Sequence, residues 1–126
     1  MRVPWYETIG LAMKMPDAKF SGTLLIPAFH FYEEYNDVFD KVSSLEMTLI
    51  SEEEKPFEVI LKFVNVSSLQ LTGFGNAYNQ LLGFHITDLK EYRVEKERRY
   101  LIEDYEDDSV SFYCEKIEIL NEAIET

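Results

Sequence analysis

The sequence predicts a mainly β domain, α+β at most, that forms an antiparallel sandwich or a strongly curved sheet of roughly six to eight strands with one short helix. Apolar and polar residues alternate with the period of a strand in several segments, and nine Phe and eight Tyr favour strands. Alanine, the best helix former, occurs only five times. With a chain of 126 residues, we expect a single domain that spans residues 1–126.

The N-terminal segment fits two structures. Strand-like alternation is present at Ile9, Leu11, Met13 and Met15. A helical face is shared by Trp5, Ile9 and Met13. Residues 20–35, which follow, are apolar and aromatic, and we expect a strand there in which Pro27 marks an edge or a β-bulge.

A first hairpin is predicted for residues 43–51 and 56–64, around the charged turn SEEEKP. Its apolar positions share one parity and are Leu45, Met47, Leu49, Phe57, Val59, Leu61 and Phe63. This pattern is typical of an antiparallel sheet with one buried and one solvated face. Alternation predicts two further strands, at residues 68–71 and 84–93.

Three glycines occur between these two strands, in GFGNAYNQLLG (73–83). A dinucleotide-binding loop needs GxGxxG, but Tyr78 stands at the third glycine position, and no GK[ST] of a P-loop follows. We therefore predict a turn at residues 73–75 and a short helix with Asn76 as its N-cap and Gly83 as its C-cap. The expected helix would have one face formed by Ala77, Tyr78, Leu81 and Leu82.

A second hairpin is predicted where residues 98–105 and 110–120 flank the polar turn EDDS. Its returning strand changes parity, because one face carries Val110, Phe112 and Cys114, whereas Ile117 and Ile119 have the opposite phase. This change predicts a β-bulge near Glu115 or Lys116, or a strand that passes from one core to another. Cys114 is then a small core residue. The tail LNEAIET fits one further helical turn.

The charge restricts the partners. Twenty-four acidic against twelve basic residues give a net charge of −12, which disfavours binding to nucleic acid and to anionic membranes and favours a basic protein partner or divalent cations. No segment is apolar enough for a membrane helix. A single cysteine and the absence of a signal-peptide pattern predict a cytoplasmic protein without disulfides.

The sequence contains no pattern that identifies a catalytic, cofactor-binding or metal site. There is no GxSxG and no HExxH. His30 and His85 each precede acidic residues, so one alternative is a small enzyme that binds a metal or ligand through the two histidines and those acids. A satisfied or exposed histidine is the simpler interpretation of both positions.

Acidic residues mixed with tyrosines predict a protein-binding surface instead, because tyrosine gives a large contact area at low entropic cost. Tyr32 and Tyr35 also lie beside acids. The candidate partner-binding residues are Tyr92, Tyr100, Glu103, Asp104, Tyr105, Glu106, Asp107 and Asp108. The expected function is therefore non-enzymatic protein binding, with a self-assembling structural subunit, a homo-oligomer, as a further alternative.

Three segments, LKFVNVSSLQL (61–71), GFHITDLKEY (83–92) and SFYCEKIEI (111–119), have a pattern of strands and turns that resembles small acidic β-rich bacterial proteins of unassigned function. Some of those proteins are immunity proteins of polymorphic toxin systems. The resemblance covers roughly the second half of the chain and carries over no site residue. It implies a cytoplasmic inhibitor of a toxin domain, and a basic toxin such as a nuclease would suit the negative charge.

Overall fold

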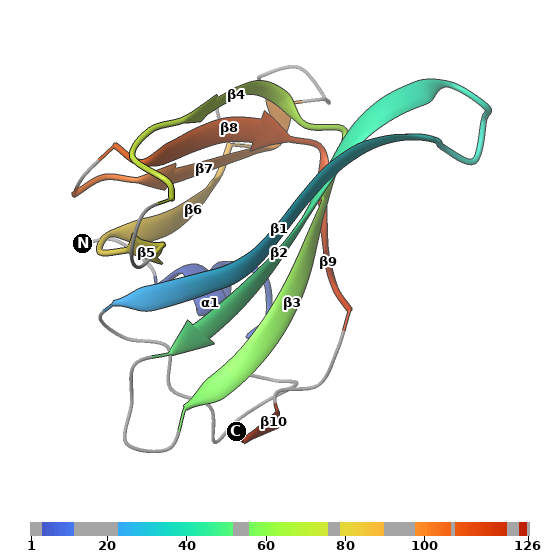
Figure 1. Ribbon diagram of the computed structural model, residues 1–126. Helices are drawn as coiled ribbons and strands as arrows, with labels where there is room; N and C mark the ends of the chain where they lie inside the picture. Colours follow the sequence, from blue (N-terminus) through green and yellow to red (C-terminus); the bar gives the residue numbers. More distant parts are fainter. Residues whose placement is uncertain are drawn as a thin grey trace.

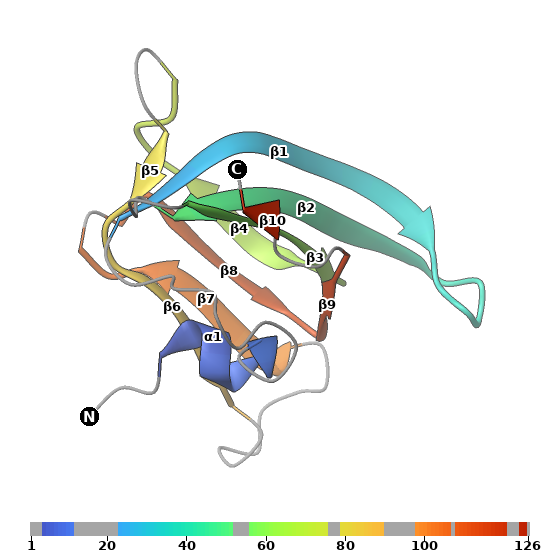
Figure 2. The same cartoon turned by 90° about the horizontal axis from the view of Figure 1, so that it is seen from below.

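Two antiparallel sheets make up the part of the protein that the computed structural model describes, which is residues 4–11, 23–51, 56–75, 79–89, 98–106, 108–120 and 124–125. The larger sheet has the strand order β10–β3–β2–β1–β5, with β9 also paired to β3. It curls over the smaller sheet, which has the order β4–β8–β7–β6 (Figures 1 and 2). The larger sheet consists of β1 (Leu24–Tyr35), β2 (Lys41–Ser51), β3 (Phe57–Val64), β5 (Gln80–Leu81), β9 (Lys116–Ile119) and β10 (Ile124–Glu125). The smaller sheet consists of β4 (Ser67–Leu71), β6 (Phe84–Asp88), β7 (Tyr100–Asp104) and β8 (Val110–Cys114).

These elements confirm the predicted fold class, a mainly β protein with a curved antiparallel sheet and a short helix. Eight of the described strands have four residues or more, while β5 and β10 have two each. Helix α1 (Trp5–Thr8) decides the N-terminal ambiguity in favour of a helix at these residues, and the predicted positions Met13 and Met15 lie outside the described residues. Within the described residues, no helix combines the length and the apolar character that a membrane crossing requires.

The first predicted hairpin is confirmed as β2 and β3. Its register places Leu45 opposite Phe63 and Leu49 opposite Val59. All four side chains are fully buried. The apolar parity therefore corresponds to the concave face of the larger sheet, which lines the core. The turn residues 52–55 lie outside the described part of the chain.

Strand β1 contains the irregularity that Pro27 predicts. Its pairing with β2 shifts register between Leu25 and Ala28. Before the shift Leu24 and Ile26 are buried, and after it the odd-numbered Phe29 and Phe31 lie opposite buried residues of β2. An extra residue at this point switches which parity faces the core, as a β-bulge does.

The second predicted hairpin is confirmed as β7 and β8, with Ile102 opposite Phe112. The phase change after Cys114 has the second of its two predicted causes, because β8 belongs to the smaller sheet and β9 pairs with β3 of the larger one. Glu115 lies at the crossing, and its backbone N–H donates to the Val64 carbonyl at 3.0 Å. The chain thus joins the two sheets along one side of the core.

One apolar cluster fills the space between the sheets and extends under α1. At its centre the rings of Phe63 and Phe112, one from each sheet, meet edge to face with centroids 5.0 Å apart. Trp5 attaches α1 to the smaller sheet, since its ring lies edge to face against Phe84 at 5.2 Å. Aromatic pairs of this geometry contribute about 0.5–1.5 kcal/mol beyond their area burial.

The glycine-rich segment and the C-terminal tail correct two predictions. The turn at residues 73–75 is present, with φ of +78° at Gly73 and +102° at Gly75. The predicted helix is wrong over Gln80 and Leu81, which pair as β5 with the start of β1, because burying Leu81 in the core outweighs local helix propensity. Asn76, Ala77 and Tyr78 lie outside the described residues.

Gly83 is not a helix cap. Its N–H donates to the Asp104 carboxylate at 2.9 Å, and its carbonyl accepts the Tyr105 N–H at 3.0 Å. A Cβ at this position would lie 2.5 Å from Cγ of Glu106, so glycine permits a close approach of two chain segments. The predicted helical turn of the tail is also wrong where the chain is described, because Ile124 and Glu125 form β10 beside β3.

Candidate functional site

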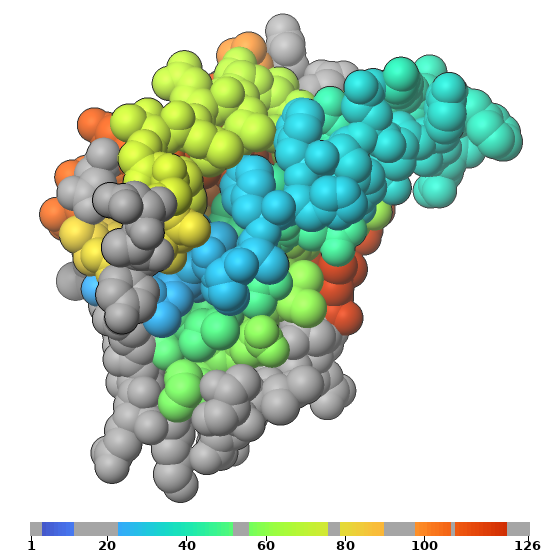
Figure 3. Space-filling model, viewed as in Figure 1, coloured from blue at the N-terminus to red at the C-terminus, as the bar shows by residue number. Residues whose placement is uncertain are grey.

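The distal part of the β1–β2 hairpin, residues 31–43, extends beyond the rest of the molecule, and we call it the hairpin arm (Figure 1). Its projection has a simple cause. The pairing of β3 with β2 ends at Val64 opposite Ser44, while the β1–β2 ladder continues to Tyr35 opposite Lys41. Over its last residues the arm is therefore a two-stranded ribbon, with no third strand beside it among those the structure describes. Figure 3 shows the arm as the protruding part of the surface.

Large apolar side chains are concentrated on this arm. Among the described residues eight such side chains are exposed, and four of them fall within residues 31–39. Their exposed fractions are 46% for Phe31, 68% for Tyr35, 71% for Val38 and 84% for Phe39. A cluster of exposed apolar groups of this kind marks a contact surface more often than a fold requirement.

The tip of the arm is held by its own backbone and by Asn36. The Asn36 side-chain oxygen accepts the N–H groups of Val38 at 3.0 Å and Asp40 at 2.9 Å. The Asn36 N–H donates to the Asp40 carbonyl, and the Phe39 N–H donates to the Asn36 carbonyl. These bonds close a three-residue loop, which fixes the positions from which Val38 and Phe39 project.

Phe39 occupies a backbone conformation that rarely suits an aromatic residue. Its φ is +64°, in the left-handed region, where the third position of such a loop usually has glycine. An L-residue with a Cβ pays roughly 1–2 kcal/mol there. Phe39 is therefore a large, exposed aromatic residue in a strained backbone conformation at the end of the arm.

The arm is also acidic. It carries four carboxylates, at Glu33, Glu34, Asp37 and Asp40, and a single lysine, Lys41. Lys41 lies 3.0 Å from the Glu33 carboxylate, but both side chains are more than half exposed, so this ion pair adds little to stability. The surface around the exposed aromatics is therefore predominantly negative.

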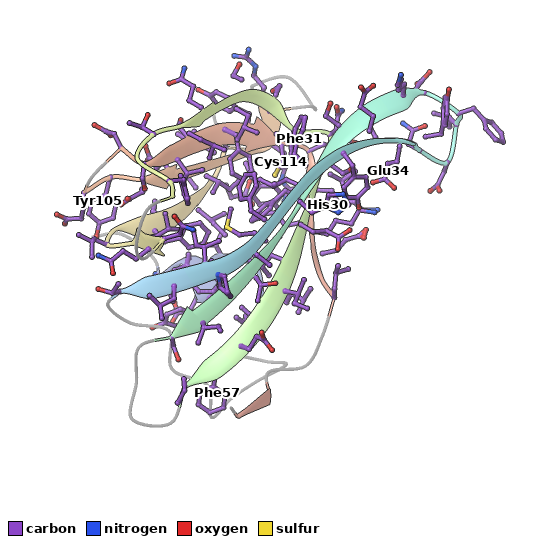
Figure 4. All side chains as sticks on the ribbon, viewed as in Figure 1. His30, Phe31, Glu34, Phe57, Tyr105 and Cys114 are labelled. Atoms are coloured by element: carbon purple, nitrogen blue, oxygen red, sulfur yellow. The ribbon has the colours of Figure 1, made fainter. Side chains whose placement is uncertain are left out.

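A polar network fixes the base of the arm on the convex face of the sheet. Lys62 of β3 places its Nζ 2.9 Å and 3.1 Å from the two carboxylate oxygens of Glu34, which also accepts the Ser44 hydroxyl. The Tyr32 hydroxyl donates to Glu46 at 2.6 Å, and the Lys62 ammonium lies 5.8 Å from the Tyr32 ring centroid. Figure 4 shows Glu34 and His30 at this position.

This network shifts the pKa values of its members in the expected directions. The hydrogen bond from Ser44 and then the contact with Lys62 lower the pKa of Glu34. The hydrogen bond to Glu34 raises the pKa of Lys62, and burial followed by the bond to Glu46 raises the pKa of Tyr32. Glu34 and Lys62 are therefore both charged at neutral pH, and they connect β1 directly to β3 across β2.

A pocket of about 230 Å³ opens beside the tip of the arm. The arm contributes residues 36–38, and the opposite side contains Asn65, Glu115 and Lys116 at the crossing between the two sheets. Val42 and Val64 provide apolar surface between them. Asn65 donates to the Glu115 carboxylate at 3.1 Å, which orients one acidic group of the lining. The pocket thus combines apolar walls with charged and amide groups.

The candidate residues named from sequence lie around the other hairpin end, between β7 and β8. Asp104 is buried, and its oxygens accept the N–H of Gly83, the N–H of Glu106 and the Ser109 hydroxyl. It is therefore a structural residue rather than a contact residue. The partly buried Tyr100 has its pKa raised by burial.

Four candidates remain at the surface of this turn. Tyr105, Glu106 and Asp108 are exposed, Glu103 is half-buried, and Tyr92 and Asp107 lie outside the described residues. Figure 4 places Tyr105 on the opposite side of the molecule from the arm. The structure thus leaves four of the predicted contact residues at the surface of this turn, but it buries Asp104, which lies in the middle of the predicted set.

The histidines and the cysteine do not form a reactive group. His30 lies on β1 of the larger sheet with its ring 4.6 Å from Tyr32, and His85 lies on β6 of the smaller sheet near Tyr105. In the parts of the chain that are described, no three His, Cys, Asp or Glu residues form a group that could hold a metal ion. Cys114 is fully buried, and burial raises its pKa to about 12, as a core thiol requires.

The tip of the arm is the feature that sequence reasoning missed. Tyr32 and Tyr35 were noticeable beside acids, but Val38 and Phe39 sit in a turn where alternation ends. The available signal was the segment NDVFD, which places two apolar residues in a loop that otherwise has polar turn residues.

Comparison of the chain with models of known protein families, with curated proteins and with solved structures found no match.

Proposed function

We propose that the protein is a non-enzymatic binding module that docks on a basic protein through the hairpin arm. The observation that carries this proposal is the projecting tip, where the exposed Tyr35, Val38 and Phe39 are surrounded by acidic residues. Aromatic anchors of this kind dominate the energy of protein interfaces. The carboxylates add selectivity for a cationic surface and accelerate encounter.

The net charge of the whole chain supports the same assignment. A protein with a net charge of −12 attracts basic partners over a distance of about one Debye length, which is roughly 8 Å at physiological salt. The resemblance to immunity proteins makes the proposal more specific, namely an inhibitor of a basic toxin domain inside the cytoplasm. In that role the acidic arm would occupy a surface that otherwise binds phosphate groups.

The proposal is tested by affinity capture from a lysate of the source organism, at low and moderate salt, with the wild-type protein and two matched variants. Tyr35→Ser with Phe39→Ser removes the arm's anchors, and Leu82→Ser with Tyr105→Ser removes exposed apolar groups elsewhere. We expect a basic protein that the wild type and the Leu82/Tyr105 variant retain at low salt and the arm variant loses. A partner retained equally by all three proteins, or no basic partner at all, contradicts the proposal.

A further inference from the structure

In the described part of the chain, no strand pairs with the outer edge of β1 along the arm. Among the described residues, β5 pairs only with Leu24 and Leu25, and the Asn79 carbonyl accepts the N–H of Ile26. Beyond the bulge, residues 28–35 pair with β2 on one side and with no described strand on the other. Figure 2 shows β1 as the outermost strand of the curled sheet along this stretch.

The hydrogen-bond pattern identifies which backbone groups point outward. The Asn36 N–H donates to the Asp40 carbonyl, so this pair is a hydrogen-bonded pair of the ladder. Because such pairs alternate in an antiparallel ladder, the intervening residues of β1 direct their N–H and C=O away from β2. The backbone of Ser43 supports this assignment. Ser43 lies opposite Glu33, and its carbonyl accepts the Val66 N–H on the far side of β2, so it points away from β1. The outward-directed groups therefore belong to Phe29, Phe31, Glu33 and Tyr35.

The two faces of this edge differ in chemistry. Phe29 and Phe31 lie opposite Met47 and Leu45 on the concave face, and Phe31 is 46% exposed there. The convex face carries Glu34, Glu46 and Lys62, and because Lys62 pairs with Glu34, this part of the face has one carboxylate in excess. A strand added at this edge would place one set of its side chains next to aromatic rings and the other set next to carboxylates.

We propose that the outer edge of β1, residues 28–35, binds an extended segment of the partner as an additional strand, with apolar residues that alternate with Lys or Arg. This inference rests on the proposed function and specifies how the arm recognises a basic protein. Addition at an open edge is an established mode of peptide recognition, in which the backbone supplies affinity and alternate side chains supply specificity. A second copy is the weaker occupant, because it would bring Glu33 and Glu34 of two arms together, whereas a basic strand complements them.

The test compares Glu33→Pro with Glu33→Ala. Both variants remove the same carboxylate, but only proline removes the outward N–H, and it leaves the bonds between β1 and β2 in place. The probe is a capped fluorescent peptide of alternating lysine and valine, used at tracer concentration in anisotropy titrations. A second peptide carries N-methyl groups on alternate residues, so that it can no longer complete a ladder. Circular dichroism verifies the fold of both variants.

We expect Glu33→Pro to bind the peptide at least about tenfold more weakly than Glu33→Ala does. We also expect the wild-type protein to bind the methylated peptide more weakly than the unmethylated peptide by a similar factor. The methylated peptide provides the test even if Glu33→Pro does not fold. Equal binding by both variants together with equal binding of both peptides overturns strand addition while leaving a side-chain docking role for the arm intact. No binding of the basic peptide or of any basic protein overturns both proposals. A dimer that Glu33→Pro disrupts and Glu33→Ala preserves, seen by sedimentation, overturns the assigned occupant in favour of a second copy.

Discussion

Two hairpin ends of this protein have similar composition and opposite construction. The β1–β2 end, residues 36–40, and the β7–β8 end, residues 105–109, both combine acids with aromatic residues. The β7–β8 end is attached to the body of the protein through the buried Asp104 and through Gly83. The hydrogen bonds described at the β1–β2 end are those of its own Asn36, and this end projects into solvent with Phe39 at its tip.

This contrast separates acids that hold the fold from acids that are available to a partner. Asp104 satisfies three internal donors, so its charge is part of the structure. Asp37 and Asp40 are exposed beside exposed apolar groups. An acidic and aromatic composition alone therefore does not distinguish a buried structural acid such as Asp104 from acids that are exposed to solvent.

The largest effect is expected from Asp104→Ala. The substitution leaves the N–H of Gly83, the N–H of Glu106 and the Ser109 hydroxyl without their acceptor, so the free energy of unfolding falls by about 3 kcal/mol. Urea denaturation measures the loss. The matched variant at the arm, Asp40→Ala, changes an exposed residue and should shift the free energy by no more than about 0.5 kcal/mol. Similar losses of unfolding free energy in both variants would show that the acids at the two hairpin ends do not differ in their contribution to the fold.

An intermediate effect is expected from Glu34→Gln at the base of the arm. The variant loses a charged partner of Lys62 and should be about 1–2 kcal/mol less stable at neutral pH. Because the fold lowers the pKa of Glu34, the stabilisation is present above the unfolded glutamate pKa of about 4.3 and is lost as pH falls through the folded value. The pKa of Lys62 is raised, so its contribution persists until the pH exceeds the ordinary lysine value of about 10.4.

Unfolding of the wild type and Glu34→Gln at neutral pH and at about pH 3 checks this dependence, since the difference between them should shrink at the lower pH. Glu33→Gln is the control, because its exposed ion pair with Lys41 predicts almost no change. If the free energies of unfolding of the wild type and Glu34→Gln differ by the same amount at both pH values, the charge of the Glu34 carboxylate does not stabilise the arm.

The smallest effect on stability has the opposite sign. Phe39→Gly relieves the positive φ at the arm tip, and the free energy of unfolding should rise by about 0.5–1 kcal/mol despite the greater freedom of glycine in the unfolded chain. Thermal unfolding measures this as a higher Tm. Binding of the basic partner should weaken in the same variant, which would identify Phe39 as a residue that favours function over stability. A lower Tm would indicate that the Phe39 ring contributes to packing instead.

Much of the sheet could be predicted because its information is local. Alternation over Leu45–Leu49 and Val59–Phe63 specifies a buried face, and the polar turns specify where strands reverse. The short β5 and β10 could not be predicted, since two residues carry no period and their pairing depends on distant strands. The burial of Asp104 likewise depends on Gly83, which lies twenty-one residues away in the chain.

The arm depends on the lengths of three strands relative to one another. The sequence indicated a strand before Tyr35 and a second one from residue 43, and it also indicated a tyrosine beside acids. It also indicated that the third strand ends at Val64, but not that the β1–β2 ladder continues past this end to Lys41, and that difference in length exposes Val38 and Phe39.

The most direct measurement places p-benzoylphenylalanine at position 39 in one protein and at position 105 in another, and irradiates each in a lysate of the source organism at low salt. Both positions are exposed aromatics, so the fold tolerates the substitution at either one. Mass spectrometry of the cross-linked products should identify a basic protein attached at position 39 and not at position 105. Cross-links to a partner from position 105 but not from position 39 would contradict the assignment of the hairpin arm as the binding element.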